Sequence, residues 1–203
     1  MRSSMDTVRY ILAVLVLISF PPALLFWLIV HPLIHFWRRM GLARSYTAIA
    51  VFYLGCVVGL FQLRRPLLAV EFGTNYWLIG LGALILAATA ALAWQRQKQL
   101  TFRILVGVPE LGPDSHPQKL LTEGIYARIR HPRYVEAVVG ILGYALIINY
   151  LAVYLIYILS LGAIYLIVNL EEKELRERYG GEYEDYCRRV PRFIPGRSEN
   201  RGQ

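Results

Sequence analysis

The hydrophobic positions of this chain fall into long blocks without charged residues, separated by polar segments. The first block, Tyr10 to Val30, has 21 residues, enough to cross a hydrocarbon core of about 30 Å at about 1.5 Å per residue. Two further blocks, Ser45 to Leu63 and Tyr76 to Trp94, have interfacial aromatic residues at their ends. Each block predicts a transmembrane helix, and the pair Pro21-Pro22 predicts a kink or break in the first one.

The last apolar block is too long for one ordinary span. It runs from Ala137 to Leu170 without a charge, which predicts a tight helical hairpin that turns near Asn149-Tyr150. A charge-rich continuation of the last helix follows, with a weak point at Gly180-Gly181. An apolar stripe at helical spacing predicts that this tail packs on the loop before the hairpin; it consists of Leu175, Tyr179, Tyr183, Tyr186 and Val190. The pattern therefore predicts an all-α integral membrane bundle of about five transmembrane helices.

Composition agrees with this pattern. Of the 203 residues, 56% are apolar and 18% are charged, and the mean hydropathy is +0.42. These values argue against a plain soluble domain, a disordered chain or a fibrous protein. The two cysteines are too few for a disulfide scaffold, and His31 and His35 lack a third ligand, so we predict no metal site.

The charges indicate how the chain lies in its membrane. The net charge is +8, and 18 of the 22 Lys and Arg residues fall on one side if the N-terminus lies outside. The positive-inside rule then places the long loop near residues 95–133 and the C-terminal tail in the cytoplasm, without any need for a nucleic-acid partner. We expect a prokaryotic inner membrane, because the chain is compact and lacks a targeting signal. We divide the chain into three N-terminal transmembrane helices at 1–98 and a loop, hairpin and tail at 99–203.

Two polar clusters flank the final hairpin. Residues 124–134 precede it and Glu171-Glu172 follow it, and the hairpin returns the chain to the same membrane face. We therefore expect His131 and Glu171 to lie near one another. Basic, aromatic and imidazole groups opposite carboxylates can hold a small ligand with separated charges. The residues alone leave open the alternative that these groups are interfacial anchors that pair with each other.

The motifs around the hairpin resemble those of a known family. The stretch from about Gln118 to Pro195 is similar to the C-terminal region of the isoprenylcysteine carboxyl methyltransferase family, which is related to the phospholipid methyltransferases. The resemblance covers about 40% of the chain. The motifs that carry it are Leu120-Leu121-Thr122-Glu123-Gly124-Ile125-Tyr126, Arg130-His131-Pro132-Arg133-Tyr134, Glu171-Glu172, Tyr179-Gly180-Gly181-Glu182-Tyr183 and Tyr186-Cys187-Arg188-Arg189-Val190-Pro191.

The resemblance implies S-adenosylmethionine bound at the cytoplasmic face, without a Rossmann domain. It implies methyl transfer to a lipophilic or membrane-accessible acceptor, either a small molecule or a lipid, that enters from the bilayer. It also implies a cofactor pocket formed by the loop, the hairpin and the tail. By similarity, the cofactor-binding residues are Gln118, Lys119, Leu120, Leu121, Tyr126, His131, Pro132, Arg133, Tyr134 and Glu171.

Two positions depart from the family pattern. Ile167 stands where the prenylcysteine enzymes have an arginine implicated in binding the substrate carboxylate, which argues against such an acceptor here. Glu136 stands where the family usually has glycine, and a carboxylate there is costly unless it faces a polar cavity. We predict Glu136 and Arg130 as catalytic candidates, with Glu136 as a substrate-side base or cation partner. The alternative for Glu136 is an interfacial salt bridge to Arg133 or Arg130.

Two other functions compete with this interpretation. Sterol-type membrane reductases, which use NADPH, resemble the same C-terminal region, but they usually have asparagine where this chain has Pro132 and are longer. A non-catalytic membrane protein with the same fold is the second alternative, and the presence of His131, Tyr134 and Glu171 argues against it.

Overall fold

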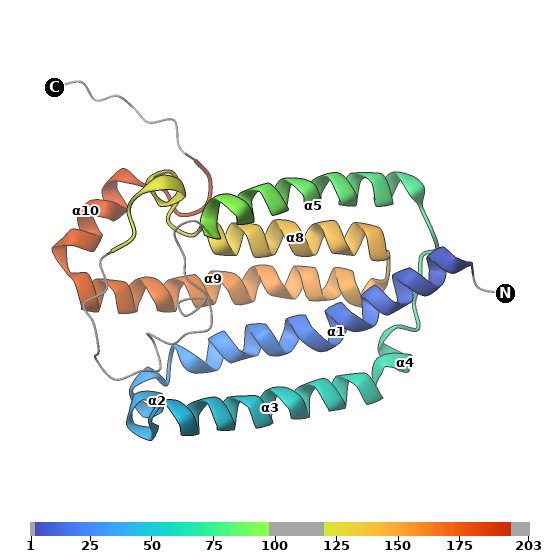
Figure 1. Cartoon of the computed structure of the whole chain (residues 1–203), viewed down its shortest axis with the longest axis horizontal. Helices are drawn as coiled ribbons and strands as arrows, with labels where there is room; N and C mark the ends of the chain where they lie inside the picture. The colour runs from blue at the N-terminus through green and yellow to red at the C-terminus, as the bar shows by residue number, and fades with distance from the viewer. Residues whose placement is uncertain (1–2, 98–119, 196–203) are drawn as a thin grey trace.

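Long helices lie side by side along one axis in the computed structural model, which describes residues 3–97 and 120–195 (Figure 1). These helices are α1 (Ser4–Val30), α3 (Leu42–Gln62), α5 (Tyr76–Gln97), α8 (Pro132–Ile148) and α9 (Leu151–Tyr179). Shorter helices connect or follow them: α2 (Ile34–Met40), α4 (Arg64–Leu67), the 3-10 helix η1 (Gly124–Ala127) and α10 (Gly181–Arg189). In the order seen in Figure 1, α8 lies between α5 and α9, and α1 lies between α9 and α3.

Four of the described helices are long and apolar enough to cross a membrane, namely α1, α3, α5 and α9. The chain is therefore an all-α integral membrane protein, as the hydrophobic pattern predicts. The predicted fifth span corresponds to α8, whose 17 residues make about 25 Å of helix. That length is at the lower limit for a bilayer core, so length and composition support four of the five predicted spans.

The proline pair does not interrupt α1. The helix is continuous from Ser4 to Val30 with Pro21 and Pro22 inside it. Of the predicted kink or break, the break is therefore wrong. Proline removes a backbone donor and crowds the preceding turn, but neighbouring helices can hold the flanking turns in a membrane bundle. Pro22 is fully buried within this packing.

A pair of glycines sets the contact between α5 and α8. A Cβ atom added to Gly82 would lie 2.6 Å from the carbonyl oxygen of Gly143 and 2.7 Å from Cγ1 of Ile147. The two backbones therefore touch, as small residues allow in membrane bundles. This close contact fixes α5 against α8 and brings the C-terminal end of α5 to the start of α8 (Figure 1).

The hairpin turn lies where the sequence predicts it. Asn149 has φ 55° in the left-handed region, which asparagine tolerates better than most residues, and it ends α8. Its side chain donates to the carbonyl of Gly73 (2.9 Å) and accepts from the Tyr154 hydroxyl (3.0 Å). The turn is thereby fixed to the connection between α4 and α5.

One end of the bundle is held by a buried arginine, and we call it the Arg9 end. Arg9 is fully buried and donates through Nε to the carbonyl of Ile148 (3.0 Å). Its Nη1 donates to Glu71 (2.9 Å) and Thr74 (2.9 Å). One side chain thus joins α1, the α4–α5 connection and the end of α8.

The opposite end, which we call the site end, contains η1, the start of α8, the end of α9 and α10. Gly180, with φ 54°, ends α9 and allows the chain to turn into α10. The predicted apolar stripe of the tail is confirmed. Its buried members Tyr183, Tyr186 and Val190 pack with Leu120 from the segment before η1.

Candidate functional site

The tail and the start of α8 are held together by main-chain hydrogen bonds. The amide of Arg130 donates to the carbonyl of Pro191 (2.9 Å), and the amide of His131 donates to that of Arg192 (3.1 Å). Pro132 is the first residue of α8, where the helix needs no N–H donor. These bonds fix the positions of Arg130 and His131 relative to the tail.

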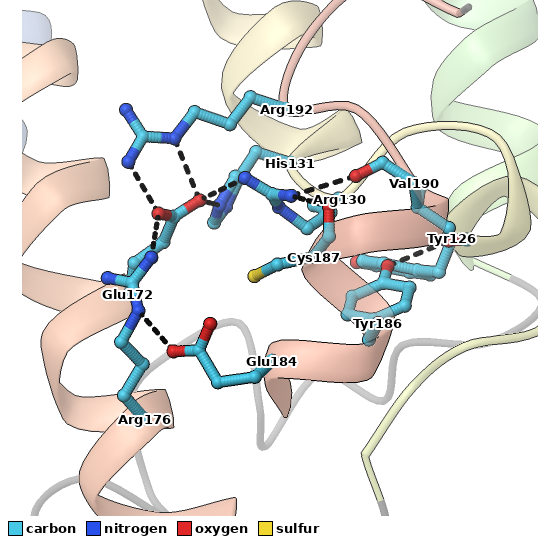
Figure 2. Close-up of polar contacts among 10 residues, drawn as sticks. All are labelled: Tyr126, Arg130, His131, Glu172, Arg176, Glu184, Tyr186, Cys187, Val190 and Arg192. Atoms are coloured by element: carbon cyan, nitrogen blue, oxygen red, sulfur yellow. Dashed lines mark hydrogen bonds and ion pairs between the residues drawn. The ribbon is translucent and has the colours of Figure 1, made fainter. Parts of the chain in front are cut away.

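A fully buried carboxylate, Glu172 on α9, is the centre of the site (Figure 2). Its Oε1 accepts from Arg130 Nη2 (3.0 Å) and His131 Nε2 (3.0 Å). Arg192 donates to both oxygens, through Nε (2.9 Å) and Nη2 (2.5 Å). Arg176, one turn further along α9, donates to Oε2 (3.3 Å). We call these five residues the Glu172 cluster. The cluster joins three segments of the chain at one buried carboxylate: the residues that precede α8, the end of α9, and the tail.

Two arginines of the Glu172 cluster also donate hydrogen bonds to residues of α10 and its C-terminal end. Arg130 Nη1 donates to the carbonyls of Cys187 (2.9 Å) and Val190 (2.8 Å) at the C-terminal end of α10, where cations are favourable. Arg176 donates to Glu184 on the exposed side of the same helix (2.9 Å). The Glu172 cluster therefore also determines the position of the tail helix.

A tyrosine joins α10 to η1. The Tyr186 hydroxyl donates to the main-chain carbonyl of Tyr126 (2.7 Å), as Figure 2 shows. Burial raises the pKa of the Tyr186 phenol, which therefore remains a protonated donor at neutral pH. The tail helix thus fixes η1 and the residue that η1 presents to the site.

A second buried charge pair joins α5 to α8. Arg96 donates through Nε to Glu136 Oε2 (2.7 Å) and through Nη2 to Oε1 (3.0 Å). This arrangement is a bidentate guanidinium–carboxylate pair, the stronger kind of ion pair. Both side chains are largely shielded from solvent, with exposed fractions of 9% and 20%. The pair belongs to the interior of the bundle end rather than to its surface.

The phenol of Tyr126 lies among the charges around this pair. Burial raises its pKa to about 12; the carboxylates of Glu171 and Glu136 add to this effect and the guanidinium groups of Arg96 and Arg133 oppose it. Tyr126 therefore stays protonated at neutral pH and can donate a hydrogen bond. We call this set the Tyr126 group; it comprises Arg96, Tyr126, Arg133, Glu136 and Glu171.

Helix α1 contributes aromatic side chains to the same end. The guanidinium carbon of Arg133 lies 4.3 Å from the ring centroid of Trp27 and 5.2 Å from that of Tyr134, within cation–π range. The ring of His31 stacks with the ring of Trp27, and their centroids are 5.4 Å apart. A helix outside the predicted 99–203 region thus contacts a residue that the motifs single out.

The structure places most of the candidate residues at the site end. Arg130 and His131 belong to the Glu172 cluster, and the Tyr126 group holds four more candidates: Tyr126, Arg133, Glu136 and Glu171. Leu120 is buried against the tail, Leu121 is exposed, and Tyr134 is buried beside Ile167. Gln118 and Lys119 lie outside the described residues.

Two predicted contacts have different partners in the structure. His131 was expected near Glu171, but its hydrogen bond is to Glu172, because consecutive helical residues point about 100° apart. The alternative prediction for Glu136 was a salt bridge to Arg133 or Arg130. In the structure both Glu136 oxygens accept from Arg96 instead. Helix rotation and register decide both contacts.

Sequence reasoning missed three contributors to this end. Arg96 has no motif and lies at the end of an apolar block, where arginine is usually interfacial. Arg192 lies in a proline-flanked segment, and Trp27 lies in the first apolar block. No local signal marks them, because their contacts here join residues far apart in the sequence.

Several buried polar atoms at this end have no hydrogen-bond partner among the described residues. They include Arg96 Nη1, Arg130 Nε, Glu171 Oε2 and His31 Nε2. Buried polar groups are nearly always paired in folded proteins, and unpaired ones commonly have a functional explanation. These atoms supply both donors and an acceptor for a polar ligand.

Comparison with known proteins identifies the family of this chain. Residues 76–182, more than half of the chain, match the family described as phospholipid methyltransferase. The chain belongs to the phospholipid methyltransferase family. The family is part of the membrane methyltransferase group related to isoprenylcysteine carboxyl methyltransferase, so the resemblance drawn from the motifs is confirmed. The matched residues contain all of the Tyr126 group and, except for Arg192, all of the Glu172 cluster.

Two curated relatives are similar over shorter stretches. The chain is 36% identical over 77 residues to the nickel-cobalt-cadmium resistance protein NccN of Alcaligenes xylosoxydans xylosoxydans, covering 38% of this chain and 36% of that protein. It is 35% identical over 85 residues to the cobalt-zinc-cadmium resistance protein CzcN of Cupriavidus metallidurans, covering 41% and 39%. The matches thus span well under half of either relative. Among the described residues, no group of three or more His, Cys, Asp or Glu side chains is arranged to hold a metal ion.

Proposed function

We propose that this protein transfers a methyl group from S-adenosylmethionine to a lipophilic or membrane-accessible acceptor. The observation that supports this proposal most strongly is the arrangement of the family-matched segment. At one end of an apolar helix bundle it presents buried donors and an acceptor that have no hydrogen-bond partner within residues 3–97 and 120–195. An acceptor that dissolves in the bilayer can approach along the helices, while a polar cofactor can approach the charged end.

The residues present fit the chemistry of this cofactor. It has an amino-acid carboxylate and amine, ribose hydroxyls, an adenine ring and a sulfonium cation. Glu171 Oε2 is a buried acceptor for an amine or hydroxyl, and Arg96 Nη1 and Arg130 Nε are buried donors for a carboxylate. Tyr126 can contribute an aromatic ring to the adenine or the cation, while the ring of Tyr134 is buried and lies within cation–π range of Arg133.

The chain contributes alignment and exclusion of water. When bound, S-adenosylmethionine supplies a methyl group on a sulfonium centre, and an in-line displacement depends chiefly on how the reacting atoms are aligned. The Glu172 cluster joins three segments at one carboxylate. Arg130 donates to this carboxylate and also to two main-chain carbonyls at the end of α10. We propose Arg130 as a positioning residue for the cofactor-binding segments.

Glu136 retains the second of its two predicted roles in this proposal. Both of its oxygens accept from Arg96, so it acts as a cation partner that orients this guanidinium. Because Arg96 occupies both oxygens, Glu136 can reach a substrate only if this pair opens. Ile167 is fully buried among apolar side chains. Its surroundings favour an acceptor other than a prenylcysteine carboxylate.

We propose that the site end faces the cytoplasm of a prokaryotic inner membrane, with the N-terminus outside. The support is the asymmetry of Lys and Arg along the chain. In this arrangement the region 1–98 is mainly a membrane frame and 99–203 supplies most of the pocket, while α5 adds Arg96 and α1 adds Trp27.

Titration calorimetry of the purified protein in detergent tests the proposal. S-adenosylhomocysteine should bind with micromolar affinity, and NADPH, the cofactor of the competing reductase function, should not. Membranes that contain the protein should then transfer label from methyl-labelled S-adenosylmethionine into material that organic solvent extracts. Absence of S-adenosylhomocysteine binding, or binding of NADPH instead, would contradict the proposed reaction class.

A further inference from the structure

The charged residues of the site are poorly placed to accept a proton. A thiol or hydroxyl group loses its proton when it takes up a methyl group, so a nearby base matters for such an acceptor. Both oxygens of Glu136 accept from Arg96. The Nε2 atom of His131 is bound to Glu172, and the proposed function uses Glu171 for the cofactor. An acceptor of this kind therefore needs another base.

A histidine at the end of α1 pairs with a carboxylate of α9. His31 directly follows α1, its side chain is 3% exposed, and its Nδ1 forms a long hydrogen bond of 3.4 Å with Glu174 Oε2. A carboxylate can only accept, so this contact places the proton of a neutral ring on Nδ1. The other ring nitrogen, Nε2, is buried and has no partner within residues 3–97 and 120–195. It presents a lone pair.

The charges around Glu174 favour the neutral form of this ring. Glu174 Oε1 accepts from Arg178 Nη2 (2.7 Å) and lies 3.6 Å from Arg38 Nη2. Two guanidinium groups thus already balance the single carboxylate. A second N–H on the His31 ring would also be buried without an acceptor in the described part of the chain, which is costly. Before the reaction, Nε2 is therefore free to take a proton.

An indole connects His31 to the motif at the start of α8. The ring of Trp27 stacks with that of His31 at 5.4 Å, and the guanidinium carbon of Arg133 lies 4.3 Å from the same indole. Trp27 also packs on the apolar cluster that contains Ile167. His31 thus lies one aromatic ring away from the motif, beside apolar side chains that suit a lipophilic acceptor. It lies outside the matched residues 76–182, so the family match assigns it no role.

We propose that His31 accepts the proton released during methyl transfer, and that the methyl acceptor is a lipophilic thiol or hydroxyl compound. The inference rests on the proposed function. As the acceptor atom bonds to the methyl carbon, the carbon–sulfur bond breaks, the sulfur keeps the electron pair, and the proton of the acceptor moves to Nε2. Glu174 is a positioning residue, because it holds the Nδ1–H and stabilises the imidazolium that forms.

Other acceptor groups fit this nitrogen less well. A carboxylate has no proton to offer, and its oxygens would face the lone pair of Nε2. An ammonium group would be repelled by the three cations that surround the pair, which are Arg38 on α2, Arg133 on α8 and Arg178 on α9. The same cations favour the negative charge that develops on a thiol or hydroxyl as it loses its proton.

Nitrogen NMR of the histidine-labelled protein in detergent tests the ring without any reaction. At about pH 8, where an ordinary imidazole is neutral, the wild type should show a histidine protonated at Nδ1 with a bare Nε2. His31→Asn should remove this signal, and the exposed His35→Gln should leave it unchanged. Glu174→Gln should reduce the fraction of this tautomer, because a carboxamide holds the Nδ1–H less strongly. A His31 ring protonated at Nε2 in the wild type would overturn the inference.

The same measurement remains decisive if His31→Asn does not fold. A protein with His35→Gln and His116→Gln retains only two histidines, His31 and His131. The bond from His131 Nε2 to Glu172 predicts a proton on Nε2 of that ring, the opposite of His31. Two rings that are both protonated at Nε2 would therefore overturn the inference.

Transfer of labelled methyl groups to matched probes tests the acceptor class. The probes are dodecanethiol, para-octylphenol and dodecanoate, which is already ionised at neutral pH and needs no base. The wild type should methylate the thiol or the phenol. His31→Asn should lower that rate by about 100-fold or more, as loss of a general base does, and should leave S-adenosylhomocysteine affinity nearly unchanged. Glu174→Gln should lower the rate by a smaller factor, and His35→Gln should retain it.

The outcomes separate this inference from the proposed function. A wild-type protein that binds S-adenosylhomocysteine but methylates only dodecanoate, or none of the three probes, would overturn the inference while the methyltransferase proposal stands. A folded His31→Asn protein that keeps the wild-type rate would do the same. Absence of S-adenosylhomocysteine binding to the wild type would contradict both. Thermal unfolding in detergent identifies any variant that has not folded.

Discussion

Glu172 shows how one side chain can hold several segments of this protein. It is fully buried, and three arginines and one histidine donate to it. Its neighbour Glu171 has the same chemistry but a different environment. An amide at 172 cannot balance these cations, and its NH₂ group would point toward other donors.

We therefore expect Glu172→Gln to destabilise the fold strongly, by about 3–5 kcal/mol, the range for removal of one partner from a buried ion pair. Thermal unfolding in detergent measures this change. The exposed Glu177→Gln on the same helix serves as the control and should leave the unfolding temperature nearly unchanged. Equal stability of the two variants would show that Glu172 is not the structural centre of the site.

The contact between α5 and α8 matters at the scale of elements, because it brings Arg96 to Glu136. A methyl group at Gly82 would collide with the backbone at Gly143, whereas Gly80 on the same helix has open space around its Cα atom. The two glycines therefore provide a matched pair of positions.

Gly82→Ala should force α5 away from α8 and cost about 1–3 kcal/mol of stability, as overpacking does. Gly80→Ala should be neutral or slightly stabilising, since alanine favours a helix by up to about 1 kcal/mol over glycine. Thermal unfolding and S-adenosylhomocysteine affinity, measured together, test both expectations. If Gly82→Ala retained both values, the two helices would not depend on backbone contact.

At the scale of the whole molecule, the Arg9 end and the site end must face opposite sides of a membrane. The four apolar helices and their exposed hydrophobic side chains, such as Val51, Leu84 and Leu159, indicate that lipid surrounds the middle of the bundle. The polar networks that hold the connections lie at the two ends.

Cysteine labelling tests the orientation. In a Cys56→Ser, Cys187→Ser background, Asn75→Cys at the Arg9 end should react with a membrane-impermeant maleimide in intact spheroplasts. Glu184→Cys on α10 should react only after the membrane is permeabilised, because the positive-inside rule places the site end in the cytoplasm. The opposite labelling pattern would reverse the topology and make a cytoplasmic cofactor inaccessible to this site.

The sequence by itself determined most of the architecture. The lengths of the apolar runs predicted the spanning helices, the uncharged run from Ala137 to Leu170 predicted the hairpin, and Asn149 marked its turn. The period of the tail's apolar residues predicted the packing of α10, and the motifs around His131 predicted the family. These signals are local, because they depend on run length, helical period and short motifs.

Only the tertiary structure decided how the polar residues pair. It selected Glu172 rather than Glu171 as the partner of His131, joined Arg96 to Glu136, and added Arg192 and Trp27 to the site end. These contacts depend on how each helix is rotated about its axis and how far it is shifted along its neighbour. Glycine contacts between α5 and α8 and main-chain bonds to the tail set that rotation and shift, and no local pattern in the sequence encodes them.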